Sequence, residues 1–283
     1  MPAAAEPMIR HISDTARWTA MHRALESDRA DALFRDPLAR RLAGERGAEI
    51  VRELPPTGEW AWALRTHLVD QAVLQAIAAG ANTVINLAAG LDARPYRLPL
   101  PPSVRWVEID LPELLREKEE LLQGERPVCR LERVSLDLSQ APSRRELFAR
   151  LGGEAERAVV VSEGLLIYLE REEVAALARD LAQPRSFWRW VLDLASPGLV
   201  EMVNRSWGEK LAQGQSRLQF GPPEGPQFFV PAGWKPLEVR SVLKAAARAK
   251  RLPLMLRLAA LLPESSGRQG GRPWTGVCTF ERA

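Results

Sequence analysis

The sequence has little of what several classes of protein depend on. It contains only two cysteines, Cys129 and Cys278, and three histidines, so we expect neither a disulfide framework nor a catalytic zinc site. No apolar run approaches the roughly 20 residues that a membrane span needs, and residues 1–10 lack the apolar core of a signal peptide. We therefore expect a cytoplasmic protein with no membrane partner and no bound metal.

A large excess of one charge is absent as well. The 283 residues carry 39 Lys and Arg against 36 Asp and Glu, a formal net charge of +3. The one basic cluster, Lys244–Arg251, has the alanine content and spacing of a solvated helix face, so no nucleic-acid partner is predicted. Hydrophobic residues make up 46% of the chain, which is enough for a core, and the length fits one large domain or one domain with appendages.

The most informative stretch is a pair of apolar runs joined by a turn of small residues. The first run, Val84–Leu87, ends in Ala88-Ala89-Gly90, and the second ends in Asp110, 20 residues after Gly90. Small residues let a ligand approach the backbone, and an acid at the tip of the next strand accepts hydrogen bonds from ribose hydroxyls. The turn lacks the full glycine pattern that cradles a pyrophosphate. The pattern therefore favours an adenosine cofactor without phosphates, such as S-adenosylmethionine, over NAD.

The rest of the chain predicts an α/β fold. Residues 14–79 have helical spacing, and from residue 82 strands alternate with helices; the predicted strands are 82–87, 104–109, 131–136, 158–161, 187–194, 237–242 and 274–281. Such alternation predicts a doubly wound, mostly parallel sheet. We expect an N-terminal helical cap over 1–80 and a core domain over 81–283. The glycine- and proline-rich segment 196–232 is too long for a simple connection and is predicted to be a lid insertion.

Ligands of such sheets bind at the carboxyl ends of the strands. The residues expected there, in strand order, are Ala88, Gly90, Asp92, Glu108, Asp110, Asp137, Leu138, Glu163 and Tyr168. Several of them also have a purely structural interpretation: Asp110 and Asp137 can cap helices, Glu163 can be a loop acid, and Tyr168 can be a core residue. Their joint placement at one edge of the sheet favours a binding site.

Five stretches together resemble the leucine carboxyl methyltransferase-like family of class I S-adenosylmethionine-dependent methyltransferases. They are Arg65-Thr66, Asn86–Arg97, Val107–Pro112, Ser135–Leu138 and Ser162–Leu169, and the resemblance runs from about Thr15 to Ala283. It implies a Rossmann-like fold, S-adenosylmethionine as the cofactor, S-adenosylhomocysteine as its product, and methyl transfer to an oxygen of an acceptor.

The resemblance also implies roles for the residues at the methionine end of the cofactor. Arg65, assisted by Arg17, would pair with the methionine carboxylate, and Glu163 would approach the methionine amine. Tyr168 would border the acceptor pocket. Because a hydroxyl acceptor needs a base, Glu163 and Tyr168 are also the candidate catalytic residues.

At the adenosine end, the resemblance implies that Ala88 and Gly90 lie against the cofactor and that Asp110 holds the ribose. Asp137 and Leu138 would frame the adenine, with Asp137 accepting a hydrogen bond from its amine.

Two positions depart from the family pattern. Ala88 replaces the usual first glycine of the turn, which narrows the approach to the backbone. Ser139 replaces an arginine that holds the substrate carboxylate in leucine carboxyl methyltransferases, and this favours a small-molecule acceptor over a protein. A cofactor-binding protein without turnover and a nicotinamide-dependent oxidoreductase stay as alternatives. The oligomeric state is not readable from the sequence.

Overall fold

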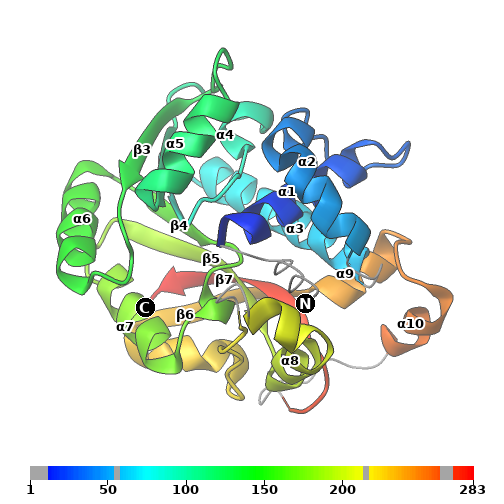
Figure 1. Cartoon of the computed structure of the whole chain (residues 1–283). Coiled ribbons are helices and arrows are strands. Elements are labelled where there is room, and N and C mark those ends of the chain that lie inside the picture. The colour runs from blue at the N-terminus through cyan, green and yellow to red at the C-terminus, as the bar shows by residue number, and fades with distance from the viewer. Residues whose placement is uncertain (1–11, 54–57, 213–216, 262–269) are drawn as a thin grey trace, which may run out of the picture.

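A computed structural model describes residues 12–53, 58–212, 217–261 and 270–283 (Figure 1). Within these ranges seven strands form one sheet in the order β3-β2-β1-β4-β5-β7-β6. Their bounds are β1 Thr83–Leu87, β2 Arg105–Asp110, β3 Arg130–Ser135, β4 Ala158–Ser162, β5 Phe187–Ala195, β6 Trp234–Ser241 and β7 Thr275–Arg282. Strands β1 to β5 pair in parallel, and β7 runs antiparallel to both β5 and β6. The predicted doubly wound, mostly parallel seven-stranded sheet is confirmed.

The strands form where apolar and β-branched residues run together. Every residue of β1 and β4 is buried, as expected for central strands that are covered on both faces. The last two predicted strands are also present, but β6 begins at Trp234, before Pro236, and not at Leu237. Pro236 is tolerated because β6 lies at the edge of the sheet, where a missing backbone donor costs no hydrogen bond on the open side.

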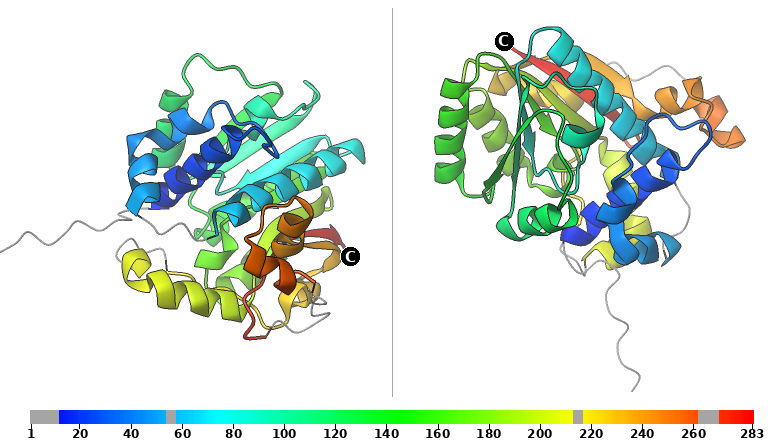
Figure 2. Two further views of the ribbon diagram at one scale, coloured as in Figure 1. Left: turned by 90° about the vertical axis from the view of Figure 1, so that its right-hand side faces the viewer. Right: turned by 90° about the horizontal axis from the view of Figure 1, so that it is seen from above.

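Helices cover both faces of the sheet (Figures 1 and 2). On one face, α6 (Ala141–Glu154) and α7 (Arg171–Leu181) bury residues such as Phe148 and Leu177 against the strands. On the other face, α3 (Glu59–Ala78) and α9 (Val242–Arg248) do the same with residues such as Val73 and Ala246. This sandwich fixes the positions of the strand ends that form the site.

The remaining helices lie around this sandwich. α1 (Ile12–Ser27) and α2 (Ala39–Glu53) pack on each other and, through a third apolar cluster, on α5 (Pro112–Leu121). The shorter elements are α4 (Arg94–Arg97), the 3-10 helix η1 (Leu166–Tyr168) and α10 (Leu254–Ala259). Of the predicted cap over 1–80, the described part thus contains α1, α2 and α3, and α3 is a layer of the core itself. None of the helices in the described residues has the length and apolar character needed to cross a membrane.

The predicted insertion over 196–232 contains two described helices. α8 (Pro197–Ala212) contacts the wall of the site, because Val200 and Val203 share a small apolar cluster with Tyr168. The 3-10 helix η2 (Gly225–Ala232) instead belongs to the main core, where Phe229 is fully buried. Of these two helices, α8 is therefore the candidate for the predicted lid, because η2 is part of the core.

Candidate cofactor-binding and active site

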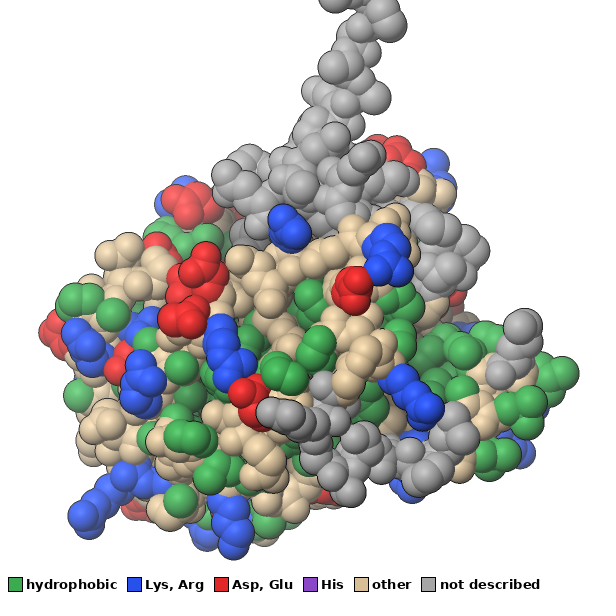
Figure 3. All heavy atoms as spheres, turned by 90° about the horizontal axis from the view of Figure 1, so that it is seen from below, with side chains coloured by type: hydrophobic (Ala, Val, Ile, Leu, Met, Phe, Trp, Pro, Cys, Tyr) green, Lys and Arg blue, Asp and Glu red, His purple; other side chains and the backbone are tan. Residues whose placement is uncertain are grey.

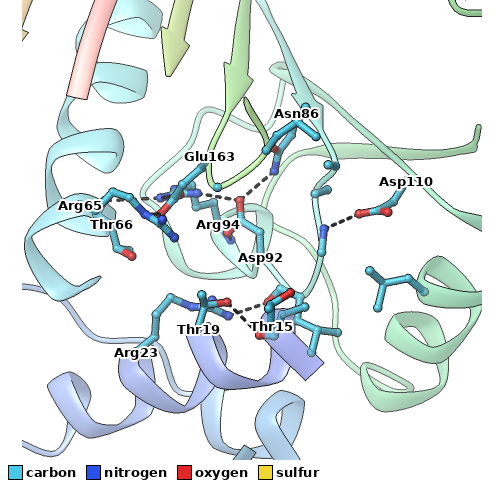
Figure 4. A pocket seen from close by; sticks show the side chains of 18 of the residues that line it. Thr15, Thr19, Arg23, Arg65, Thr66, Asn86, Asp92, Arg94, Asp110 and Glu163 are labelled. Atoms are coloured by element: carbon cyan, nitrogen blue, oxygen red, sulfur yellow. Dashed lines mark hydrogen bonds and ion pairs between the residues drawn. The ribbon is translucent and has the colours of Figure 1, made fainter. Parts of the chain in front are cut away.

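The site lies where the strand order reverses, between β1 and β4. Leu87 pairs with Ile109 of β2 on one side and with Ser162 of β4 on the other. The chain therefore leaves all three strands at one level, and this brings Ala88, Asp110 and Glu163 to the rim of one pocket. Helices α1 and α3 close the pocket with Thr15, Thr19, Arg23, Trp62, Arg65 and Thr66 (Figure 4).

The turn after β1 has the backbone geometry that small residues allow. Ala88 has φ 48° and Gly90 has φ 49°, both in the left-handed region. The Gly90 amide donates to Asp110 Oδ2 at 2.6 Å, and the Leu111 amide donates to Oδ1 at 2.8 Å. Asp110 thus fixes the turn to the neighbouring strand. Burial raises the pKa of Asp110 despite these two amides.

Two arginines hold Glu163 at the end of β4. Arg65 Nε lies 3.0 Å from Glu163 Oε1, and Arg94 lies 2.7 Å from Oε2 (Figure 4). Burial alone would raise the pKa of this carboxyl, but the charges of Arg94 and Arg65 keep it below its usual range. Glu163 is therefore an anchored carboxylate at neutral pH.

Arg65 is itself held by a second acid, Asp193, which is not among the predicted site residues. Asp193 of β5 lies 3.3 Å from Arg65 Nη1 and accepts the Gly164 amide at 2.7 Å. The guanidinium also lies over the ring of Trp62, 4.7 Å from its centroid. Asp193 does not line the pocket, but it sets the direction of two groups that do.

A buried polar network supports Arg94 from behind. Arg94 Nε donates to Asp70 at 2.6 Å and Nη1 donates to Asp92 at 2.9 Å, while the Asn86 amide donates to the same Asp92 oxygen at 2.9 Å. All four side chains are buried. Because each charge is paired, the network can hold the pocket wall in one arrangement.

The part of the pocket next to Arg65 and Glu163 is aromatic and apolar. Tyr168, Leu165 and Trp62 line it. Burial raises the pKa of Tyr168, so its phenol is protonated at neutral pH. Trp62 stacks on His22 with ring centroids 5.8 Å apart, and burial lowers the pKa of His22 to about 4.

The structure brings six of the predicted site residues to one pocket: Arg65, Ala88, Gly90, Asp110, Glu163 and Tyr168. It places the other three elsewhere. Arg17 forms an ion pair with Glu117 of α5, and neither Asp137 nor Leu138 lines this pocket. The Asp137 carboxylate is exposed and accepts the Ser139 amide at 2.9 Å, which lowers its pKa. Roles for these three residues at the cofactor stay predictions.

One acid expected at the rim is in the core. Glu108 is fully buried and lies 2.7 Å from the equally buried Lys118 Nζ and 3.0 Å from Arg133 Nε. Glu108 and Asp110 are two residues apart, so their side chains leave the same face of β2. Their positions along the strand separate them, because Asp110 is at the strand end beside the pocket and Glu108 lies further inside, where Lys118 and Arg133 pair with it.

A comparison with protein families decides what kind of protein has this site. The model described as "Leucine carboxyl methyltransferase" matches residues 16–182, which is more than half of the chain. The chain belongs to this family. It is an S-adenosylmethionine-dependent methyltransferase, and this confirms the predicted cofactor and reaction class.

Relatives of this methyltransferase share sequence identity with it over most of its length. It is 35% identical over 199 residues to a putative S-adenosyl-L-methionine-dependent methyltransferase of Streptomyces coelicolor, covering 66% of this chain and 70% of the relative. A protein of the same description from Parafrankia is 33% identical over 265 residues, covering 88% and 84%.

Solved structures share its fold at low sequence identity. A duf574 family protein from Streptomyces avermitilis superimposes with a TM-score of 0.61 and 14% identity, covering 95% of this chain and 97% of that one. An O-methyltransferase family protein from Burkholderia thailandensis gives 0.51 and 17%, covering 96% and 70%. These similarities support the Rossmann-like class I fold.

Proposed function

We propose that this methyltransferase transfers the methyl group to an oxygen of a small molecule, and that a carboxylate is the favoured acceptor. The observation that carries the proposal is the state of the two candidate bases. Glu163 is ionised but bound by two guanidinium groups, and Tyr168 is a protonated phenol. Neither group is suited to take a proton from an alcohol at neutral pH.

The residues of the pocket fit the cofactor in chemical type. Asp110 would accept from the ribose hydroxyls, and the turn at Ala88–Gly90 lets the cofactor approach the backbone. A side chain at Gly90 would point toward Ala16 of α1, 3.6 Å away, and would fill part of this cradle. At the other end, Glu163 would accept from the methionine amine and Arg65 would pair with the carboxylate.

When bound, the cofactor supplies a methyl group that its sulfonium already activates. The protein then has to hold the acceptor in line and keep water out. Trp62 and Leu165 would contact the body of the acceptor, and the Tyr168 hydroxyl would donate a hydrogen bond that orients the acceptor oxygen. A carboxylate needs no base, so this arrangement is sufficient for ester formation.

Product analysis with a methyl-labelled cofactor tests this proposal. The purified protein is incubated with panels of small carboxylic acids, phenols and alcohols, and with a peptide that ends in a free leucine carboxylate. We expect label in a small carboxylic acid, released as methanol by mild base because it is an ester. Label stable to base would indicate an ether and refute the carboxylate preference, and label only in the peptide would refute the small-molecule acceptor.

The variants Tyr168→Phe and Glu163→Gln test the roles of these residues. Tyr168→Phe should lower kcat by about tenfold and leave the pH profile flat near neutrality, because an orienting donor and not a base is lost. Glu163→Gln should mainly raise KM for the cofactor. A cofactor-loaded protein that labels no acceptor class would favour the alternative of a binding protein without turnover.

A further inference from the structure

The helix α10 presents leucines to solvent. Leu254 and Leu258 are 77% and 73% exposed, and their spacing of four residues puts them on one stripe of the helix. Leu261, in the turn that follows α10, is 79% exposed and extends this apolar surface. Leu256 is exposed as well. Leu252 is buried and Ala260 packs on the core cluster of α3 and α9, so the segment is anchored while these leucines face outward.

This stripe lies at the margin of the molecule. In Figures 1 and 2, α10 projects on the side opposite α6 and α7, next to α9. Figure 3 shows hydrophobic side chains gathered at the right-hand margin with basic side chains around them. A protein surface rarely exposes several neighbouring leucines unless they contact a partner.

The segment of chain that carries the stripe is rich in basic residues. Residues 239–261 contain six basic side chains, Arg240, Lys244, Arg248, Lys250, Arg251 and Arg257, and no acidic one. Arg251 is paired with Glu26 and Asp31, and Arg240 lies 3.9 Å from Glu238. Arg248 and Lys250 are exposed, and in the part of the chain that is described neither forms an ion pair. The segment is therefore both apolar and cationic.

We propose that α10 and its basic flank dock on the surface of an anionic phospholipid bilayer. The leucine stripe would enter the boundary between headgroups and acyl chains, and Arg248, Lys250 and Arg257 would lie at the level of the anionic headgroups. This revises the expectation of no membrane partner, which rested on the lack of a spanning segment and does not bear on a helix that lies in the surface.

Other occupants fit the observations less well. In a two-fold dimer the same patch meets itself, so the exposed cations Arg248 and Lys250 of the two copies would be brought together. A nucleic acid would use the cations but leave the leucines in water. An anionic bilayer satisfies both features at once.

Co-sedimentation of the full chain with vesicles tests the proposal. Vesicles of phosphatidylcholine alone are compared with vesicles that also contain phosphatidylglycerol, and binding is expected only to the second kind. The double variant Leu254→Asp/Leu258→Asp should bind at least tenfold more weakly. Each basic residue near an anionic surface strengthens binding about fivefold, so Arg248→Gln/Lys250→Gln should weaken binding by about 25-fold.

A matched control changes exposed valines elsewhere. Val128 and Val230 are 41% and 47% exposed, and Val128→Asp/Val230→Asp should bind vesicles like the unaltered protein. Thermal melts of all variants show whether each is folded. No binding by the unaltered protein, or equal binding by the leucine variant, would overturn the proposal. So would a dimer that the leucine variant disrupts in sedimentation velocity while no vesicles bind, because a second copy would then cover the stripe.

Discussion

In the turn after β1, replacing Ala88 by glycine should stabilise the protein, although most substitutions of alanine by glycine lower the free energy of unfolding. Ala88 is in the left-handed region with φ 48°, where an alanine costs about 1–2 kcal/mol relative to glycine. Glycine in turn stabilises the unfolded chain by about 0.4–1 kcal/mol. Because Ala88 is partly exposed, little buried contact is lost. The substitution Ala88→Gly should therefore stabilise the protein by about 0.5–1 kcal/mol.

The neighbouring alanine is the matched control. Ala89 is buried, and it is not among the described residues with positive φ. Ala89→Gly relieves no backbone strain. It removes a buried methyl group, which contributes about 0.8 kcal/mol, and it raises the conformational entropy of the unfolded chain as much as Ala88→Gly does. It should destabilise the protein by about 1–2 kcal/mol. Two adjacent, identical substitutions are thus expected to have opposite signs.

Urea unfolding and thermal melts measure both effects. Ala88→Gly should raise the unfolding midpoint by about 1–3 °C with an unchanged dependence on urea, and Ala89→Gly should lower it. Binding of S-adenosylhomocysteine to Ala88→Gly should be equal or tighter, because a methyl group that lines the pocket is removed. A loss of stability in Ala88→Gly equal to that in Ala89→Gly would refute the strain at Ala88.

Three further predictions concern buried charges. Asp193→Asn keeps an acceptor for the Gly164 amide but removes one carboxylate from Arg65, so calorimetry should show about tenfold weaker cofactor binding in a folded protein. Burial raises the pKa of Asp110, so the carboxylate form is lost as the pH falls through that raised value. Binding of S-adenosylhomocysteine should weaken there, and the pH dependence should be absent in Asp110→Asn. Lys118→Met leaves Glu108 with Arg133 alone and should cost about 3 kcal/mol in urea unfolding, whereas full stability would show that the pair contributes nothing.

The fold followed from patterns that are local in the sequence. Apolar runs predicted the central strands of the sheet, and the turn of small residues after Leu87 with an acid at the end of the next strand located the centre of the site. Pro236 misled the prediction of β6, because a sequence does not say which strand will lie at the edge of the sheet. α4 was missed since four residues are too few to show a helical period.

The supporting charges of the site could not be predicted in the same way. Asp193 holds Arg65 only because β5 lies beside β4, and this neighbour relation is a property of the sheet order. A signal was present, since Asp193 is an acid between leucines in an otherwise apolar run, and an acid in such a strand needs a partner. Arg94 lies in the stretch Asn86–Arg97 that carries the family resemblance, but its contact with Glu163 joins segments that are far apart in the chain.

The pocket at the ends of β1 and β4 should bind the cofactor through Asp110 and Arg65. Titration calorimetry with S-adenosylmethionine and S-adenosylhomocysteine tests it directly, with Asp110→Ala, Arg65→Ala and the surface control Arg150→Ala, a residue 44% exposed at its side chain. We expect micromolar binding that is lost in Asp110→Ala and Arg65→Ala and kept in Arg150→Ala. Absence of binding to the folded protein, preference for a nicotinamide cofactor, or unchanged affinity in Asp110→Ala and Arg65→Ala would contradict it.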